Sequence, residues 1–134
     1  MAEKLEGRAK ELVLDKNFAH LSVPRNDGTI QTAVVWADAD DEGRVVVNSA
    51  EGRTWPRRLR HAGRTTISVH NHTNPYEYVV IEGTVDADTH EGADDVIDAL
   101  AKKYLDADSY PFRREGEQRV TFRIRPDRVS VYGG

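Results

Sequence analysis

The sequence predicts a single, mainly β domain in which six or seven strands form a small closed antiparallel barrel, with helices at three places. Three observations carry this prediction. Apolar segments of strand length follow one another with short turns between them, which favours hairpins. The chain has 134 residues, the length of one domain over residues 1–134, and can bury one hydrophobic core. Strands this numerous in so short a chain favour closure, because closure removes exposed edges.

An amphipathic helix, a hairpin and a third strand are predicted for the first part of the chain. Leu5, Ala9 and Leu12 fall on one face at helical spacing. The stretches PRNDG and ADDEG are rich in residues that favour turns. The predicted elements are a helix over 3–15, strands over 18–23, 29–38 and 44–49, and turns over 24–28 and 39–43.

A short helix is predicted after the third strand. Thr54 is the predicted N-cap, because its hydroxyl can accept a hydrogen bond from a backbone N–H of the first turn. Pro56 suits that first turn, where no intrahelical N–H bond is lost. Gly63 tolerates the left-handed conformation that commonly ends a helix. The sequence therefore predicts a helix over residues 55–62.

Further strands and one more helix are predicted for the second half of the chain. Gly83 interrupts a long strand pattern, which indicates a bulge or a bend. Asp88, with Glu91 three residues later, resembles a capping box and predicts a helix that runs to about Tyr104. The remaining predicted elements are strands over 64–71, 75–87, 118–126 and 128–132, and a polar loop over 105–117.

The overall charge excludes some classes of partner. The chain carries 19 basic and 23 acidic residues, and the net charge of −4 argues against general binding to nucleic acid or to an acidic membrane surface. It has no cysteine, so disulfides and thiolate chemistry are excluded. No apolar run approaches the roughly 20 residues of a membrane span, and the charged N-terminus lacks a signal-peptide core. We therefore expect a cytoplasmic protein.

The segment 48–64, NSAEGRTWPRRLRHAGR, concentrates five arginines against a single glutamate. It joins a predicted strand end to a predicted helix start, where free backbone N–H groups and the helix dipole attract anions. The side chains suited to gripping a phosphate are Asn48, Ser49, Arg53, Arg57 and Arg58. The alternatives are a solvated helix face paired with acids elsewhere, and a nucleic-acid contact in which Trp55 stacks on a base.

A second group of residues resembles a metal motif. His70, His72 and Glu77 follow the spacing of the first metal motif of cupins, in which two histidines and a glutamate bind a metal inside a barrel. A cupin needs a further histidine downstream, and only His90 follows, at a predicted helix start. Strand-end histidines without a metal are the commoner explanation. No metal ligand is therefore predicted, and a metal-binding cupin stays a remote alternative.

Aromatic residues gather near predicted strand ends and the arginine-rich segment. They are Trp36, Trp55, Tyr76 and Tyr78. The usual role of such side chains is packing in a core or an interface. The functional alternative is a pair of walls for a flat ring whose phosphate lies on the arginines. The sequence contains nothing that resembles a serine triad, a P-loop or a dinucleotide-binding glycine motif.

The order of these segments resembles a known family. The stretches FAHLSVPRNDGTIQTAVVWAD, GRVVVNSAEGRTWPRRLRHAGRTTISV, NPYEYVVIEGTVD and RVTFRIRPDRVSVYG span about residues 15–133. They are similar to the pyridoxamine 5′-phosphate oxidase-like, FMN-binding split β-barrel proteins, and most resemble the small deazaflavin (F420)-dependent oxidoreductase branch. The resemblance implies a mainly β fold with peripheral helices, a six- to seven-stranded antiparallel split β-barrel.

The resemblance also implies a cofactor site. Proteins of the family form homodimers with two cofactors at the interface, and a strand matching Gly28–Gln31 runs beside the cofactor ring. Trp55 stands where the family often has lysine and Arg58 where it often has asparagine, so a positive charge is kept. The implied cofactor-binding residues are Gln31, Thr32 and Val34 along the ring, Asn48, Ser49, Arg53, Thr54, Arg57 and Arg58 at the phosphate, and in addition Trp36, Trp55 and Tyr78, the last on a strand that approaches the partner's cofactor.

The implied function is that of an oxidoreductase that uses reduced coenzyme F420 to transfer hydride to a small electron-poor organic acceptor. In such enzymes the cofactor carries the chemistry, so no catalytic side chain is predicted. The alternatives within the same fold are an FMN-binding oxidase or reductase and a flavin carrier. Fold likeness does not define the acceptor.

Overall fold

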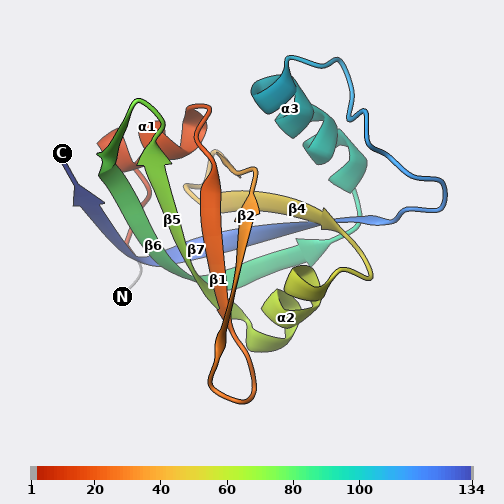
Figure 1. Ribbon diagram of the computed structural model, residues 1–134, viewed down its shortest axis with the longest axis horizontal. Helices are drawn as coiled ribbons and strands as arrows, with labels where there is room; N and C mark the ends of the chain where they lie inside the picture. The colour runs from red at the N-terminus through yellow and green to blue at the C-terminus, as the bar shows by residue number, and fades with distance from the viewer. Residues whose placement is uncertain (1–2, 134) are drawn as a thin grey trace.

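Seven antiparallel strands form one strongly curled sheet, with three helices packed against it (Figure 1). The computed structural model describes residues 3–133. Along the sheet the strand order is β2-β1-β5-β6-β7-β4-β3. The strands are β1 Ala19–Pro24, β2 Ile30–Val35, β3 Asp38–Ala39, β4 Val45–Ala50, β5 Arg64–Asn71, β6 Asn74–Thr89 and β7 Arg119–Tyr132. The helices are α1 Gly7–Leu14, α2 Thr54–Ala62 and α3 Ala93–Leu105.

The mainly β split-barrel fold is confirmed, but the expected closure of the barrel is wrong. Within residues 3–133, β2 and β3 are the two edges of the sheet, and each pairs with a single neighbour. These two edges are consecutive in the chain, so the segment Trp36–Ala37 passes from one edge of the sheet to the other. The strand predicted over 29–38 therefore ends at Val35.

The C-terminal part of α3 satisfies the backbone at this crossing. The hydroxyl of Tyr104 accepts a hydrogen bond from the N–H of Ala37 at 3.1 Å and donates to the carbonyl of Asn17 at 2.6 Å. The Lys103 ammonium donates to the carbonyls of Val13 and Ala37. Burial raises the pKa of Tyr104 to about 12, so the phenol stays protonated and can donate. Hydrogen bonds from side chains thus take the place of the backbone hydrogen bonds that β2 and β3 would have shared in a closed barrel.

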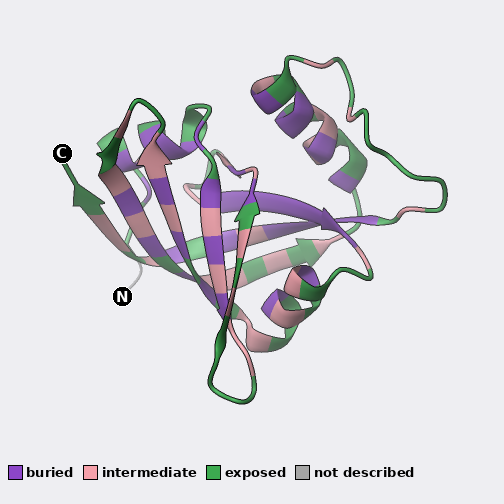
Figure 2. Cartoon of the chain, viewed as in Figure 1, coloured by how far each residue is buried: buried purple, intermediate pink, exposed green. Residues whose placement is uncertain are grey.

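The concave side of the sheet holds the main core, and α3 covers part of the convex side. Leu21, Ile67, Ile81 and Phe122 are fully buried inside the curl, together with Leu59 of α2. Every residue of β4 is buried, because one face looks into this core and the other lies under α3 (Figure 2). The centre of the sheet is thus a rigid support for groups at the end of β4.

The first two helices differ from prediction at their N-termini. α1 begins at Gly7 rather than at residue 3, although the predicted apolar face is buried. The N-cap of α2 is Arg53, and Thr54, predicted as the cap, is the first helical residue and makes no side-chain capping bond. Gly63 ends α2 as predicted, with a φ of 72°. Pro56 lies in the first turn of α2, as predicted.

The capping box predicted for α3 is wrong. Asp88 belongs to β6, where its carboxylate holds the guanidinium of Arg60, and α3 begins only after Gly92, which has a φ of 73°. Two predicted C-terminal strands are in fact one, since β7 continues through Pro126. The predicted irregularity at Gly83 is confirmed as a register shift opposite Pro126. Within residues 3–133 no helix combines the length and apolar character needed to cross a membrane.

Candidate functional site

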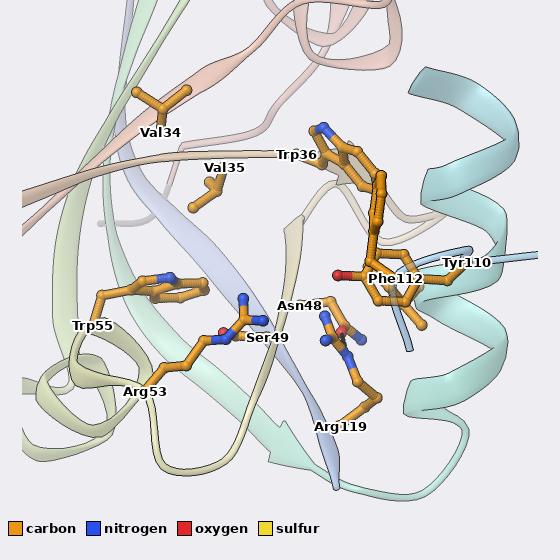
Figure 3. Close-up of a pocket in the computed structure, with 11 residues that line it drawn as sticks. Val34, Val35, Trp36, Asn48, Ser49, Arg53, Trp55, Tyr110, Phe112 and Arg119 are labelled. Atoms are coloured by element: carbon orange, nitrogen blue, oxygen red, sulfur yellow. Dashed lines mark hydrogen bonds between the residues drawn. The ribbon is translucent and has the colours of Figure 1, made fainter. Parts of the chain in front are cut away.

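A pocket of about 200 Å³ opens where the end of β2, the end of β4, the start of α2 and the loop between α3 and β7 meet (Figure 3). Arg53 and Trp55 lie on one side of it, and Tyr110, Phe112 and Arg119 on the other (Figure 3). The lining residues are Val34, Val35, Trp36, Asn48, Ser49, Arg53, Trp55, Ile97, Tyr110, Phe112 and Arg119.

The floor of the pocket is a buried, ordered arginine. The side chain of Arg119 is almost completely buried, and its Nε donates to Oδ1 of Asn48 at 3.0 Å. The amide nitrogen of Asn48 donates in turn to the carbonyl of Ala93 and to the hydroxyl of Thr121, each at 3.0 Å. Because β4 pairs with β7, Arg119 lies opposite Ala50 in the sheet. Its guanidinium is therefore held in one orientation at the end of β4.

One polar atom beside this floor lacks a partner. Oγ of Ser49 is buried and makes no hydrogen bond to any residue the structure describes, whereas Nη1 of Arg119 makes no hydrogen bond but lies 3.2 Å from Oε1 of Glu117 in an ion pair. Ser49 is only 1% exposed, so its hydroxyl is removed from bulk water. Leaving a buried donor without a partner costs roughly 1–3 kcal/mol. An anion that accepted a hydrogen bond from the Ser49 hydroxyl would relieve that cost, which makes this part of the pocket a candidate anion site.

A second arginine and a carboxylate complete the charged end of the pocket. Arg53 is half exposed, and its Nη2 lies 3.9 Å from Oε1 of Glu117. The same oxygen is 3.2 Å from Nη1 of Arg119, so Glu117 bridges the two guanidinium groups. The Glu117 side chain is only 7% exposed, and its second oxygen, Oε2, is buried without a hydrogen-bond partner among the described residues. The charged end thus combines two cations with one anion.

Aromatic rings line both sides of the pocket, next to the charged groups (Figure 3). Trp36 meets Tyr110 edge to face, with ring centroids 6.1 Å apart. The guanidinium of Arg119 lies over the Tyr110 ring at 4.9 Å, which ties this aromatic wall to the charged floor. Trp55 packs against the core residue Phe122 at 6.2 Å while it still faces the pocket. Flat walls beside a cationic floor suit a planar ring that carries an anionic group.

Half of the predicted cofactor residues line this pocket, and the other half lie elsewhere on the chain. Those in the pocket are Val34, Trp36, Asn48, Ser49, Arg53 and Trp55. Those outside it are Gln31, Thr32, Thr54, Arg57, Arg58 and Tyr78. Gln31 lies on the inward face of β2, with Oε1 buried and unpaired, whereas Thr32 is exposed and shares a hydrogen bond with Ser22. Tyr78 stacks on Tyr132, with ring centroids 4.7 Å apart.

Arg57 and Arg58 line a different depression from Arg53. Together with Pro24, Asn26 and His61 they border a space of about 230 Å³ beside the β1–β2 hairpin. The helix rotates by about 100° per residue, so side chains at successive positions of α2 point to different sides. The arginine-rich segment therefore divides between two depressions, and the assignment of Arg57 and Arg58 to the phosphate stays a prediction.

The other arginines of this segment differ in their pairing. Arg60 is neutralised by the carboxylates of Glu51 and Asp88. Arg64 lies at the start of β5, beside a third and more polar depression. Part of the arginine-rich segment is thus a solvated helix face whose charges are paired with acidic residues. The sequence offered this as an alternative to an anion site for the whole segment.

The residues of the suspected metal motif have structural partners. Nδ1 of His72 lies 2.7 Å from Oδ1 of Asn17, in the turn before β6. The carboxylate of Glu77 accepts hydrogen bonds from Arg8 and from Asn71, and these contacts hold the pKa of Glu77 at about 2. Among residues 3–133, no group of three or more His, Cys, Asp or Glu side chains is placed to hold a metal.

Sequence reasoning missed Arg119, Tyr110, Phe112 and Glu117. Arg119 begins a strand rich in arginines, a pattern that predicts a solvated face, and its contacts with Asn48, Tyr110 and Glu117 hold it in a buried position. Tyr110 and Phe112 belong to a loop that is mostly polar, so its composition predicted a solvated loop and no part of a site. That pair of aromatics inside a polar loop was the one available signal.

Comparison with known proteins identifies the fold. No protein-family model matches the chain, and no curated protein does. A structure named F420 reductase is 24% identical, with a TM-score of 0.77 over 90% of this chain and 94% of its own. A conserved hypothetical protein from Mycobacterium tuberculosis is 16% identical, with a TM-score of 0.75 over 98% of this chain and 86% of its own. A pyridoxamine 5′-phosphate oxidase-like protein from Listeria innocua is 12% identical, with a TM-score of 0.63 over 85% of this chain and 86% of its own.

These likenesses define the class of fold. The chain has the split β-barrel of the pyridoxamine 5′-phosphate oxidase-like proteins, as the resemblance predicted. One of its structural neighbours is named F420 reductase and another is described as pyridoxamine 5′-phosphate oxidase-like, and at these identities the likeness shows the fold.

Proposed function

We propose that the protein is an oxidoreductase that binds the deazaflavin coenzyme F420 and uses its reduced form to reduce a small electron-poor organic compound. The phosphate of the coenzyme binds at Ser49, Arg53 and Arg119, and its flat ring lies among the aromatic walls. The observation that carries the proposal is the buried, unpaired hydroxyl of Ser49 in an aromatic pocket that also holds the guanidinium groups of Arg53 and Arg119.

The residues present fit such a coenzyme. A phosphate oxygen accepts hydrogen bonds, which is what the Ser49 hydroxyl lacks, and its negative charge suits the guanidinium groups of Arg53 and Arg119. When bound, the reduced coenzyme supplies the hydride. Arg119 and Arg53 anchor the phosphate, Asn48 keeps Arg119 in orientation, and Trp36, Trp55 and Tyr110 exclude water from the ring. An FMN-binding oxidase, reductase or carrier of the same fold is the second candidate, because FMN also joins a flat ring to a phosphate.

We further propose that the working form is a homodimer whose partner closes the site. The pocket of one chain measures about 200 Å³. Sites for ligands of this size usually measure about 300–1,000 Å³, so one chain supplies part of a site. Val34, on the open edge strand β2, and Phe112 are 64% and 62% exposed on the pocket rim. Exposed apolar side chains beside an unpaired strand edge suit contact with a second copy.

Cofactor titration tests the proposed function. We expect purified protein to bind F420 with a Kd in the micromolar range or below, and to bind FMN more weakly, as followed by quenching of Trp36 and Trp55 fluorescence. With reduced F420 and a quinone, the visible absorbance of the oxidised coenzyme should return faster than without protein. Binding of FMN alone, with a flavin spectrum, would instead favour the second candidate. Failure to bind either compound at 100-fold higher concentration would contradict the proposal.

The oligomeric state tests the shared site. We expect wild-type protein to have twice the chain mass of 15.1 kDa by light scattering. Val34→Glu places a charge on the exposed edge and should raise the dimer dissociation constant at least tenfold, since a buried unpaired charge is costly. Leu105→Glu is the matched control, because Leu105 is an exposed apolar residue outside the pocket rim. A monomeric wild type at tens of micromolar would contradict the shared site.

A further inference from the structure

We propose that Glu117 sets the charge preference of the phosphate site, so that it takes a singly charged phosphodiester in preference to a doubly charged phosphomonoester. The inference rests on the proposed function and names the class of phosphate that the same site selects. F420 carries its phosphate as a diester with one negative charge. FMN carries a monoester, whose charge at neutral pH is −1.5 to −2.

The geometry of Glu117 gives it access to both cations of the site. Its Oε1 lies 3.2 Å from Nη1 of Arg119 and 3.9 Å from Nη2 of Arg53. A turn closed by the hydrogen bond from the N–H of Glu117 to the carbonyl of Arg114, at 3.2 Å, places Glu117 two residues before β7. The carbonyl of the intervening Gln118 accepts a hydrogen bond from the N–H of Glu51 at 2.9 Å, so the backbone on both sides of Glu117 is held in place.

The charges at this end of the pocket do not cancel. Arg53 and Arg119 are the charged residues of the lining, and the carboxylate that contacts their guanidinium groups, among the described residues, is that of Glu117. Two positive charges and one negative charge leave a single positive charge for a ligand to neutralise. A diester leaves the filled site neutral, whereas a dianionic monoester leaves an excess negative charge in a partly buried space.

The orphaned oxygen of Glu117 points to the same selectivity. Oε2 is buried and accepts no hydrogen bond from the described residues. A dianionic phosphate repels that oxygen, so the two anions would compete for the same guanidinium groups. A diester brings half the charge and an apolar substituent, and repels the carboxylate less.

The test compares ligands that share one ring and differ in phosphate charge. Riboflavin, riboflavin 5′-methylphosphate and FMN carry zero, one and about two negative charges at pH 7.5. Fluorescence titrations at constant ionic strength give the Kd of each for wild type, for Glu117→Gln and for the control Glu115→Gln, an exposed acid of the same loop. Removing the carboxylate should tighten binding roughly threefold for each unit of ligand charge in a water-like medium.

We therefore expect Glu117→Gln to leave the Kd of riboflavin unchanged, to lower the Kd of the diester about threefold and to lower the Kd of FMN about tenfold. In Glu115→Gln all three Kd values should stay as in wild type. Equal factors for diester and monoester would overturn the inference while the phosphate site stands. If wild type binds both phosphates no better than riboflavin, the proposed function itself fails. Should Glu117→Gln not fold, the wild-type affinities decide. Wild type must bind the diester more tightly than FMN, and tighter binding of FMN overturns the inference.

Discussion

Ser49→Ala should weaken binding of the phosphate-bearing cofactor and at the same time leave the protein as stable as before, or more stable. A hydrogen bond from the Ser49 hydroxyl to a charged phosphate contributes roughly 1.5–3 kcal/mol, so its loss should raise the Kd about 10- to 150-fold. Without ligand, Oγ of Ser49 is buried and has no partner in the described structure. Removing an unsatisfied hydroxyl removes a desolvation cost, so urea denaturation of the apo protein should show no loss of stability.

Weaker cofactor binding without a loss of stability distinguishes a residue that binds the ligand from one that supports the fold. A hydroxyl that held the fold together would lower stability when removed, and a spectator would alter neither quantity. Ser22→Ala is the matched control, because the Ser22 hydroxyl is 3.1 Å from that of Thr32 and lies outside the pocket. An unchanged Kd in Ser49→Ala would contradict the assignment of the phosphate to this floor.

Arg57 and Arg58 supply a comparison for the same measurement. They line the separate depression near the β1–β2 hairpin. With the phosphate at Ser49 and Arg119, Arg57→Ala and Arg58→Ala should raise the Kd less than Ser49→Ala does. A larger loss in either arginine variant would place the phosphate in the second depression instead.

Gly83→Ala should lower the free energy of unfolding by roughly 2–3 kcal/mol. A Cβ at this position would lie 2.5 Å from Cγ2 of Ile124 and 2.8 Å from the carbonyl oxygen of Arg125. The second contact is with backbone, so β6 and β7 would have to separate where the register shifts opposite Pro126. Because these two strands form the longest pairing of the sheet, the strain falls on its centre.

Urea denaturation measures this change as a lower midpoint with an unchanged slope. Gly133→Ala is the control, since a Cβ there would meet nothing within 4 Å. A midpoint for Gly83→Ala equal to that of wild type would show that the two strands relax around the methyl group without cost.

The local elements were predictable because their signals are local. The hairpin β1–β2, the helix α2 ended by Gly63 and the irregularity at Gly83 follow from turn residues and apolar spacing over a few positions. The N-caps of the helices were harder to predict. Thr54 and Asp88 are good capping residues by type, but the actual boundaries depend on where β4 and β6 stop.

The prediction of a closed barrel was wrong because the end of β2 depends on residues far away in the sequence. The apolar pattern continues through Trp36, so nothing in the sequence marks the end of β2 at Val35. The chain leaves the strand there because Tyr104 and Lys103, far along the chain, satisfy the backbone of Ala37. A pattern over neighbouring residues cannot contain that information.

The sequence by itself determined that an acidic chain presents a basic strand-to-helix junction, with Asn48, Ser49, Arg53 and Trp55 side by side, because residues so close along the chain share one turn of structure. Only the tertiary structure decided what faces them. Antiparallel pairing of β4 with β7 brings Arg119 opposite Ala50, and the loop before β7 adds Tyr110, Phe112 and Glu117. The helical rotation of α2 then sends Arg57 and Arg58 to another depression. Strand pairing and helix rotation therefore define the site, since each acts over distances in sequence that local patterns do not span.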